Sequence, residues 1–94
     1  MESLQQHYRE ALSARIEALE TARRVLIDGD IDALDTIKRI AHSLKGSGGT
    51  YGFGEITVVA SAVDLAGPGD LVEKVDALLA VLRNVAAGGD AGQQ

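Results

Sequence analysis

Apolar residues recur three and four positions apart along most of this chain, and this spacing limits the fold more than any other feature. It puts the apolar side chains of a segment on one face of a helix, which then has to be buried against a neighbouring helix. The spacing defines four segments. We expect their buried faces to consist of Leu4, Tyr8, Ala11, Leu12, Leu19, Ala22 and Leu26 in the first, Leu34, Ile37, Ala41 and Leu44 in the second, Ile56, Val59, Ala60, Val63 and Ala66 in the third, and Val72, Val75, Leu78, Leu79, Leu82 and Val85 in the fourth.

Turn and capping residues separate these segments. Asp28-Gly29-Asp30 and Gly67-Pro68-Gly69 interrupt the helical spacing. Polar residues that can accept hydrogen bonds from the first backbone N–H groups of a helix stand at three of the expected starts. These are Ser3 with Gln6, Asp30, and Asp70 with Glu73.

The third segment is the one whose helical character is open to question. Residues 55–63 are rich in β-branched side chains, so propensity alone would allow a strand. The apolar positions fit a helical stripe better than strict alternation, and a lone strand would have nothing to pair with. We therefore expect a helix.

Four amphipathic helices joined by short turns predict an all-α protein, an antiparallel four-helix bundle. A length of 94 residues favours a single domain. We expect residues 1–87 to form the bundle and residues 88–94 to be a flexible C-terminal tail or linker.

Composition excludes several classes of site. The absence of cysteine rules out disulfides and thiolate metal sites, and the two histidines are too far apart in sequence to suggest a metal site. No apolar run approaches the roughly 20 residues that span a bilayer, and the N-terminus lacks the pattern of a secretory signal. We expect a cytoplasmic protein with no metal, no cofactor of its own and no membrane association.

The charges are unevenly distributed. The net charge of −5 argues against nucleic acid as a partner, because binding to nucleic acid depends on Lys and Arg neutralising phosphates. No acidic residue lies between Asp35 and Glu55, whereas Lys38, Arg39 and Lys45 all lie there. This local positive charge indicates a small anionic group or an acidic partner surface; a chance gap in the acidic residues is the alternative.

His42 lies in the middle of this basic window. It falls well outside the apolar stripe of its helix, so we expect it to be exposed. Lys45 and Gly46, three and four residues later, lie on the same side of the helix. A neutral imidazole is a nucleophile near physiological pH, and this surface would suit a histidine that accepts a phosphoryl group and passes it to a docked partner.

Three glycines follow this histidine. Each glycine inside a helix costs about 1 kcal/mol relative to alanine, so Gly46, Gly48 and Gly49 together would cost roughly 3 kcal/mol. Either the helix ends at Gly46 and a loop follows, or the missing side chains let the backbone of another protein reach His42.

The run His42-Ser43-Leu44-Lys45-Gly46-Ser47, followed by Tyr51-Gly52-Phe53, resembles the signature of histidine phosphotransfer (HPt) domains. It is also similar to the phosphoacceptor domain of chemotaxis histidine kinases. The resemblance is closest from Ala41 to Asp64. It implies that His42 is the phosphorylated residue and that the partner is a response-regulator receiver domain, whose aspartate exchanges the phosphoryl group and whose Mg²⁺ assists the transfer.

Several neighbours would support that role. Lys45 and Lys38 would offset the charge of the phosphoryl group, and Arg39, Gly46, Gly49 and Asp64 complete the candidate site. In chemotaxis-type relatives a glutamate occupies the position that matches Asp64 and can bond the histidine ring. Because aspartate is one methylene shorter, we expect a solvated residue at the flank of the site, and the alternative is a carboxylate that bonds one ring nitrogen of His42 and sets its tautomer.

Two further features allow two interpretations each. Arg15 falls inside the apolar stripe of the first helix; we expect it to extend to the surface, and the alternative is that it approaches the active face. Val58, Ala62 and Leu65 lie opposite the expected core stripe of the third helix. They would form an apolar contact patch, either for a docked receiver or for a second copy of the chain, or be ordinary exposed aliphatic residues.

The sequence therefore predicts a monomeric phosphoryl carrier of a two-component phosphorelay, without an ATP-binding kinase site. One alternative is the phosphoacceptor domain of a larger histidine kinase, whose donor would be ATP held by a separate domain. The other is a helical adaptor or dimerisation bundle with no phosphoryl chemistry.

Overall fold

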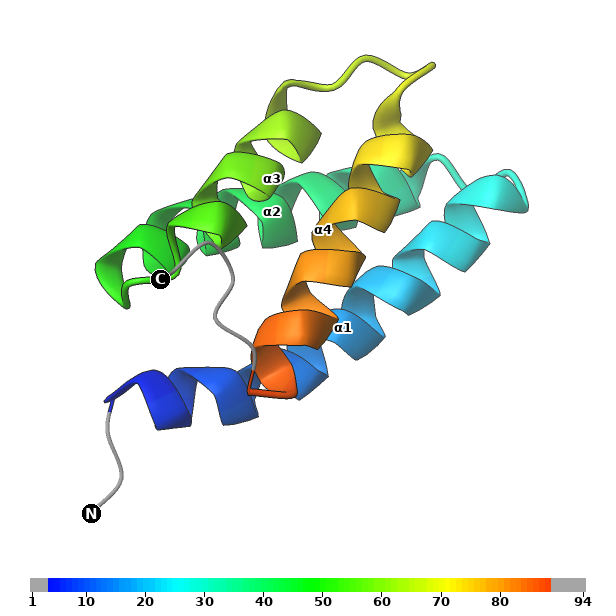
Figure 1. The fold of residues 1–94 in the computed structure, drawn as a ribbon. Coiled ribbons are helices and arrows are strands. Elements are labelled where there is room, and N and C mark those ends of the chain that lie inside the picture. Colours follow the sequence, from blue (N-terminus) through cyan, green and yellow to red (C-terminus); the bar gives the residue numbers. More distant parts are fainter. Residues whose placement is uncertain (1–3, 89–94) are drawn as a thin grey trace.

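A computed structural model describes residues 4–88, and four helices make up most of this part of the chain (Figure 1). They are α1 (Leu4–Ile27), α2 (Asp32–Thr50), α3 (Gly54–Leu65) and α4 (Leu71–Ala86). The colours of Figure 1 show that the chain reverses direction from each helix to the next. The all-α class is confirmed, as is the helical form of the third segment. Of the expected tail, only residue 88 is among the described residues.

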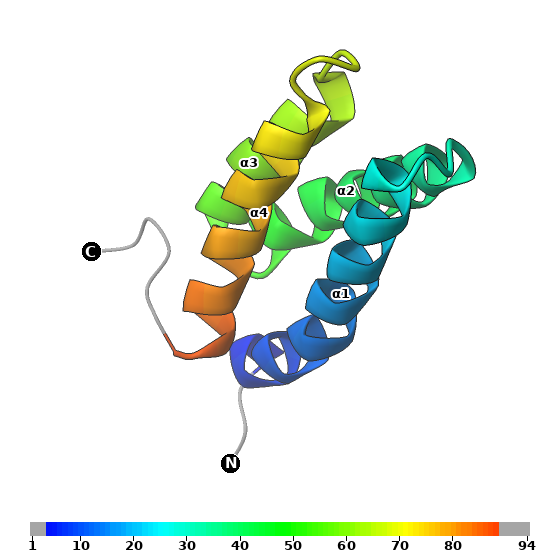
Figure 2. The ribbon, with the colours of Figure 1, turned by 90° about the vertical axis from the view of Figure 1, so that its right-hand side faces the viewer.

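The four helices enclose one core. Helix α2 packs against α1 and α3, and α4 packs against the same two helices from the other side (Figure 2). The core consists of small and medium aliphatic side chains with one aromatic ring, that of Phe53, and contains no buried polar residue within residues 4–88. Three predicted core residues lie outside the core. Leu4 is 71% exposed at the first turn of α1, where no neighbouring helix covers it, Ala11 is also exposed, and Val72 is half-buried at the start of α4.

The helix starts differ in part from expectation. The Asp30 carboxylate accepts a hydrogen bond from the Asp32 backbone N–H at 3.0 Å, so it acts at the start of α2 as predicted. Asp70 precedes the first residue of α4, but its side chain makes no capping hydrogen bond, and the capping box predicted there is wrong. Instead, its backbone carbonyl accepts from the Lys74 N–H. The cap predicted at Ser3 lies outside the described residues.

Aromatic residues fix the turn between α2 and α3. Gly52 has a φ of +88°, a conformation that favours glycine, and lets the chain turn between the two helices. Phe53, which follows it, is fully buried. The Tyr8 ring of α1 stacks on Tyr51 and Phe53, at centroid distances of 4.8 and 5.6 Å, and its hydroxyl lies 2.8 Å from the Ser47 hydroxyl. These contacts hold the start of α1 against the end of α2.

Candidate functional site

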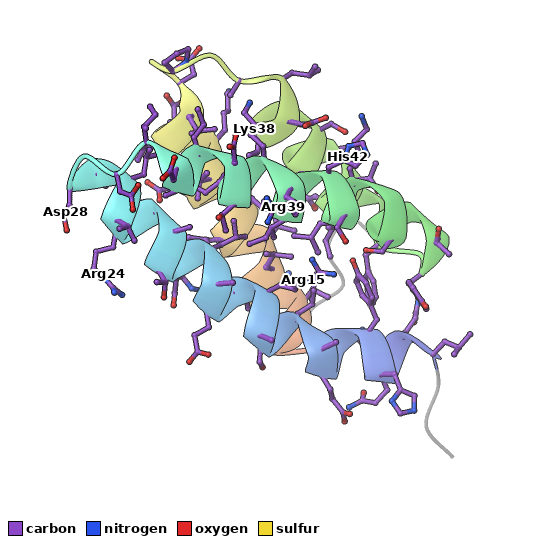
Figure 3. All side chains as sticks on the ribbon, turned by 180° about the vertical axis from the view of Figure 1, so that it is seen from behind. Arg15, Arg24, Asp28, Lys38, Arg39 and His42 are labelled. Atoms are coloured by element: carbon purple, nitrogen blue, oxygen red, sulfur yellow. The ribbon has the colours of Figure 1, made fainter. Side chains whose placement is uncertain are left out.

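His42 lies on the outer surface of α2 (Figure 3). Its neighbours Ala41 and Leu44 are buried in the core, and their burial fixes the orientation of the helix. The His42 side chain is 74% exposed, as its place outside the apolar stripe predicted. An imidazole in this position is accessible to a partner without any rearrangement of the bundle.

Asp64 of α3 faces the His42 ring. Its Oδ2 atom lies 3.7 Å from His42 Nδ1 and 3.6 Å from Lys45 Nζ, and the Asp64 side chain is only 25% exposed. Both distances are longer than a hydrogen bond but short enough for electrostatic interaction. The expectation of a solvated flank residue is therefore wrong: the packing of α3 against α2 brings the carboxylate between the two side chains, and the shorter aspartate still reaches them.

Close packing of α2 and α3 produces this geometry. A Cβ atom at Gly48 would lie 2.9 Å from the Cβ and Cγ2 atoms of Ile56, so only glycine allows α3 to come this near. The Thr57 hydroxyl donates a hydrogen bond to the Lys45 carbonyl oxygen at 2.9 Å. Helix α2 continues to Thr50, and the alternative of a loop after Gly46 is wrong.

The other two glycines of α2 differ from Gly48. A Cβ atom at Gly49 would lie 3.3 Å from the Thr57 hydroxyl oxygen, a tight contact. A Cβ atom at Gly46 would meet no atom within 4 Å, so the packing of the bundle gives no reason for a glycine at this position. The bare backbone of Gly46, one turn beyond His42, is consistent with the close approach of another protein.

Lys38 lies one turn before His42, but its ammonium group is directed to the end of α3. Its Nζ donates hydrogen bonds to the backbone carbonyls of Val63, Asp64 and Ala66, at 2.8, 2.9 and 2.9 Å. The expectation that Lys38 would offset the charge of a group on His42 directly is not supported by this geometry, because its three N–H donors are already used.

Arg15 reaches the same face from α1. Its Nη2 atom donates a hydrogen bond to the Ser43 hydroxyl at 3.1 Å, next to His42 in the sequence. The Arg15 side chain thus extends to the exposed surface, and there it also approaches the face that carries His42, as the alternative proposed. Arg39 is exposed on α2 (Figure 3), which leaves its guanidinium accessible.

Two exposed aliphatic side chains lie on α3, which also carries Asp64. Val58 is 66% and Leu65 is 82% exposed, and Ala62 is half-buried between them. Residues four and seven apart lie on one side of a helix, so Val58, Ala62 and Leu65 form one apolar patch.

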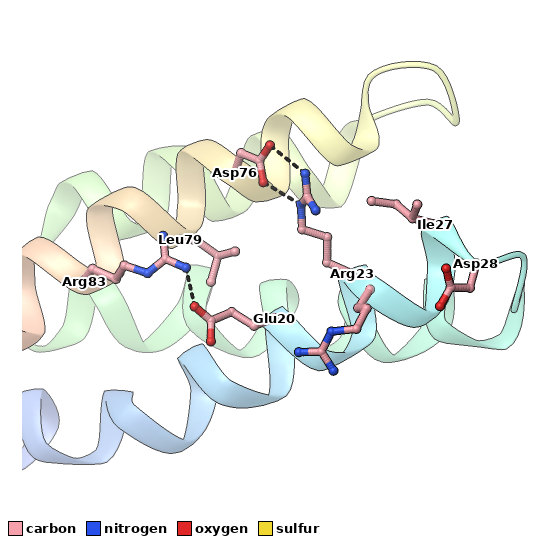
Figure 4. A pocket seen from close by; sticks show the side chains of 8 residues that line it. Glu20, Arg23, Ile27, Asp28, Asp76, Leu79 and Arg83 are labelled. Carbon is pink, nitrogen blue, oxygen red and sulfur yellow. Dashed lines mark hydrogen bonds and ion pairs between the residues drawn. The ribbon is translucent and has the colours of Figure 1, made fainter.

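A groove of about 420 Å³ lies elsewhere, between α1 and α4 (Figure 4). Two ion pairs cross it, Arg23 with Asp76 at 2.6 Å and Glu20 with Arg83. His42 is on α2 and does not line this groove, and the two ion pairs link α1 to α4.

The sequence did not indicate the contacts of Thr57 and Ser43, nor that Lys38 would bond the end of α3. Threonine and serine are common on helix surfaces, and nothing in their local sequence distinguishes these two. The basic residues were visible, but their partners depend on how the helices pack.

Within residues 4–88 no helix is long and apolar enough to cross a membrane, and no group of acidic residues and histidines is arranged to hold a metal ion. Fold and site together define a class: helical bundles that present a histidine beside a cation on the outer wall of one helix. The family model of the Hpt domain matches residues 3–88, and the chain belongs to this family. Searches among curated proteins and among solved structures each gave no match.

Membership of the family gives the chain its general role. Hpt domains are phosphoryl carriers without kinase activity, act in the histidine phosphotransfer of phosphorelays, and interact with response regulators and kinases. The predicted phosphorelay role is confirmed at this level.

Proposed function

We propose that His42 is the phosphoacceptor and that the chain, as a monomer in the cytoplasm, exchanges a phosphoryl group with the aspartate of a response-regulator receiver domain. The exposed imidazole on α2, with Lys45 and Asp64 beside it, is the observation that supports this proposal. All three side chains come from one chain, so no second copy is needed to complete the site.

The transfer requires little from the chain beyond positioning. A ring nitrogen of neutral His42 attacks the phosphorus atom of the aspartyl phosphate, the N–P bond forms as the P–O bond breaks, and the aspartate carboxylate leaves. Transfer in the other direction reverses these steps. Phosphoryl transfer is assisted mainly by orientation and by neutralisation of charge, and Mg²⁺ held by the receiver would supply part of the latter.

Lys45 and Asp64 have complementary parts in this proposal. The Lys45 ammonium offsets the charge of about −1.5 to −2 that a phosphoryl group adds, by analogy with other phosphorylated side chains. The Asp64 carboxylate faces Nδ1, which favours a proton on that nitrogen and leaves the other ring nitrogen free to attack.

The apolar patch of Val58, Ala62 and Leu65 supports a receiver as the partner. A receiver must contact the surface around His42 while its aspartate reaches the ring, and burial of exposed aliphatic side chains contributes about 25 cal/mol per Å² to such a contact. The basic residues near His42 would favour the acidic surroundings of a receiver's acceptor aspartate.

The acid lability of the label tests the site. Incubation of the chain with a phosphorylated receiver should give a label that is lost in acid, as phosphohistidine is, and that His42→Gln abolishes. His7→Gln is the matched control and should be labelled normally, because His7 lies on the exposed side of α1. A normal label in His42→Gln would refute the assignment.

The donor distinguishes the remaining alternatives. Labelling by phosphorylated receivers supports a relay protein, whereas labelling only by ATP with an isolated kinase catalytic domain would indicate a phosphoacceptor domain of a kinase. No labelling by either donor would favour an adaptor or dimerisation bundle.

A further inference from the structure

The Lys38 ammonium makes three hydrogen bonds, all to one short segment of backbone. Its acceptors are the carbonyl oxygens of Val63, Asp64 and Ala66, at 2.8–2.9 Å. An ammonium group has three N–H donors, so every donor is used, and all of them hold the end of α3 to α2.

This segment needs such a partner. The last carbonyls of a helix have no N–H within the helix to bond, and α3 ends at Leu65, after which Ala66 adopts an extended conformation (φ −68°, ψ 140°). A positive charge is also favourable near the carboxyl end of the helix dipole. Lys38 supplies both the donors and the charge from the neighbouring helix.

Asp64 is held by two lysines at different atoms. Lys38 bonds its backbone carbonyl, and Lys45 lies 3.6 Å from its side-chain oxygen. Lys38 lies one turn before His42 and Lys45 almost one turn after it. Through these two lysines, α2 contacts both the backbone and the side chain of Asp64, whose carboxylate faces the His42 ring.

We propose that Lys38 is a positioning residue: by holding the carbonyls at the end of α3, it sets where the Asp64 carboxylate lies relative to the His42 ring. Lys38 makes no contact with the phosphoryl group and acts through Asp64. The consequence for phosphoryl transfer rests on the proposed function of His42, but the consequence for the ring does not.

The tautomer of the His42 ring is the first readout. Long-range ¹H–¹⁵N spectra at a pH where the ring is neutral report which nitrogen carries the proton, in the intact unphosphorylated chain. Three variants are compared with the wild type: Lys38→Met, Asp64→Asn and the double variant. Lys38→Met keeps approximately the length of the lysine side chain but removes its hydrogen-bond donors. Lys74→Met on α4, which does not pack against α2, removes the same charge as a control.

We expect Asp64→Asn and Lys38→Met to shift the tautomer populations in the same direction. Lys38→Met should have no further effect when Asp64→Asn is already present. The control Lys74→Met should match the wild type. An unchanged tautomer in folded Lys38→Met would overturn the proposal. Independent, additive shifts in the double variant would overturn it as well. If Lys38→Met does not fold, Lys38→Gln, with a shorter uncharged donor, should give a smaller shift of the same sign, and no shift would again refute the role.

The rate of transfer is the second readout. At a saturating concentration of phosphorylated receiver, we expect Lys38→Met to slow labelling of His42 about two- to fivefold, the range of a partly exposed ionic contact, with no additional loss in the double variant. If even the wild-type chain is not labelled, the proposed function fails, while the spectra still decide whether Lys38 positions Asp64.

Discussion

Two glycines of α2, only two residues apart, have opposite surroundings. A Cβ atom at Gly48 would lie 2.9 Å from the Cβ of Ile56, an atom that cannot move without the backbone of α3. A Cβ atom at Gly46 would meet nothing within 4 Å. Packing inside the chain explains the first glycine, whereas it gives no reason for the second.

Alanine at the two positions should therefore have opposite effects on stability. Gly46→Ala should raise the free energy of unfolding by about 1 kcal/mol through helix propensity. Gly48→Ala should lower it by up to about 2 kcal/mol, because overpacking costs about 1–3 kcal/mol and offsets the gain of about 1 kcal/mol in propensity. Urea denaturation followed by circular dichroism measures both.

Gly46→Ala also tests why position 46 has no side chain. If the backbone of a receiver approaches there, Gly46→Ala should transfer the phosphoryl group more slowly although it is more stable than the wild type. If Gly46→Ala transfers the phosphoryl group at the wild-type rate, the partner does not require the absence of a side chain at position 46.

Lys45 is the cation best placed to act on a group carried by His42, since the donors of Lys38 are used elsewhere. We expect Lys45→Ala to slow transfer by about tenfold or more, because a hydrogen bond to a charged group contributes about 1.5–3 kcal/mol. Rapid-quench measurement of phosphohistidine, with circular dichroism to verify the fold, tests this. Unchanged transfer in a folded variant would remove Lys45 from the mechanism.

At the scale of the helices, Tyr8 joins the start of α1 to the end of α2 through its hydrogen bond with Ser47. Burial raises the pKa of Tyr8 above its usual value of 10.0, and this effect exceeds the opposing effects of the Ser47 hydrogen bond and of Arg15. The folded protein therefore holds this proton more tightly than the unfolded chain. The contribution of Tyr8 to stability is complete below pH 10 and is lost as the pH rises through the raised pKa.

Tyr8→Phe isolates this effect from the titration of other groups. At pH 7 the variant should be less stable by about 1 kcal/mol, through loss of one hydrogen bond and the unsatisfied Ser47 hydroxyl. Above pH 10 the difference from wild type should shrink, because only the wild type loses stability by ionisation of this residue. A difference that stays constant between pH 7 and 11, measured by urea denaturation, would contradict the assignment.

At the scale of the whole molecule, one core supports all four helices. Leu78 of α4 is fully buried among residues of the other helices. Leu78→Ala should lower the free energy of unfolding by about 2–5 kcal/mol, a large share of the 5–15 kcal/mol typical of small proteins.

Because the core is shared, this variant should lose all helices in one transition. Helix content by circular dichroism and tyrosine fluorescence should change together on heating. Separate transitions would show that part of the bundle, such as α2 with α3, is stable by itself. The exposed substitution Ala80→Ser on α4 is a control and should change stability by less than about 0.5 kcal/mol.

The sequence by itself determined the helices and the surface on which His42 lies. Both depend on spacing within one segment, which the 3.6-residue turn converts directly into direction. This is why the β-branched third segment is a helix despite its propensity, and why His42 and Gly46 are exposed while Ala41 and Leu44 are buried.

Only the tertiary structure decided what surrounds His42. The contacts of Asp64 with His42, of Lys38 with the end of α3, and of Arg15 with Ser43 join residues on different helices, 22 to 28 positions apart in the sequence. They depend on how closely the helices pack, which for α2 and α3 is set by Gly48 against Ile56 and by the turn at Gly52. Helical spacing carries no information on that distance, because it describes each helix alone.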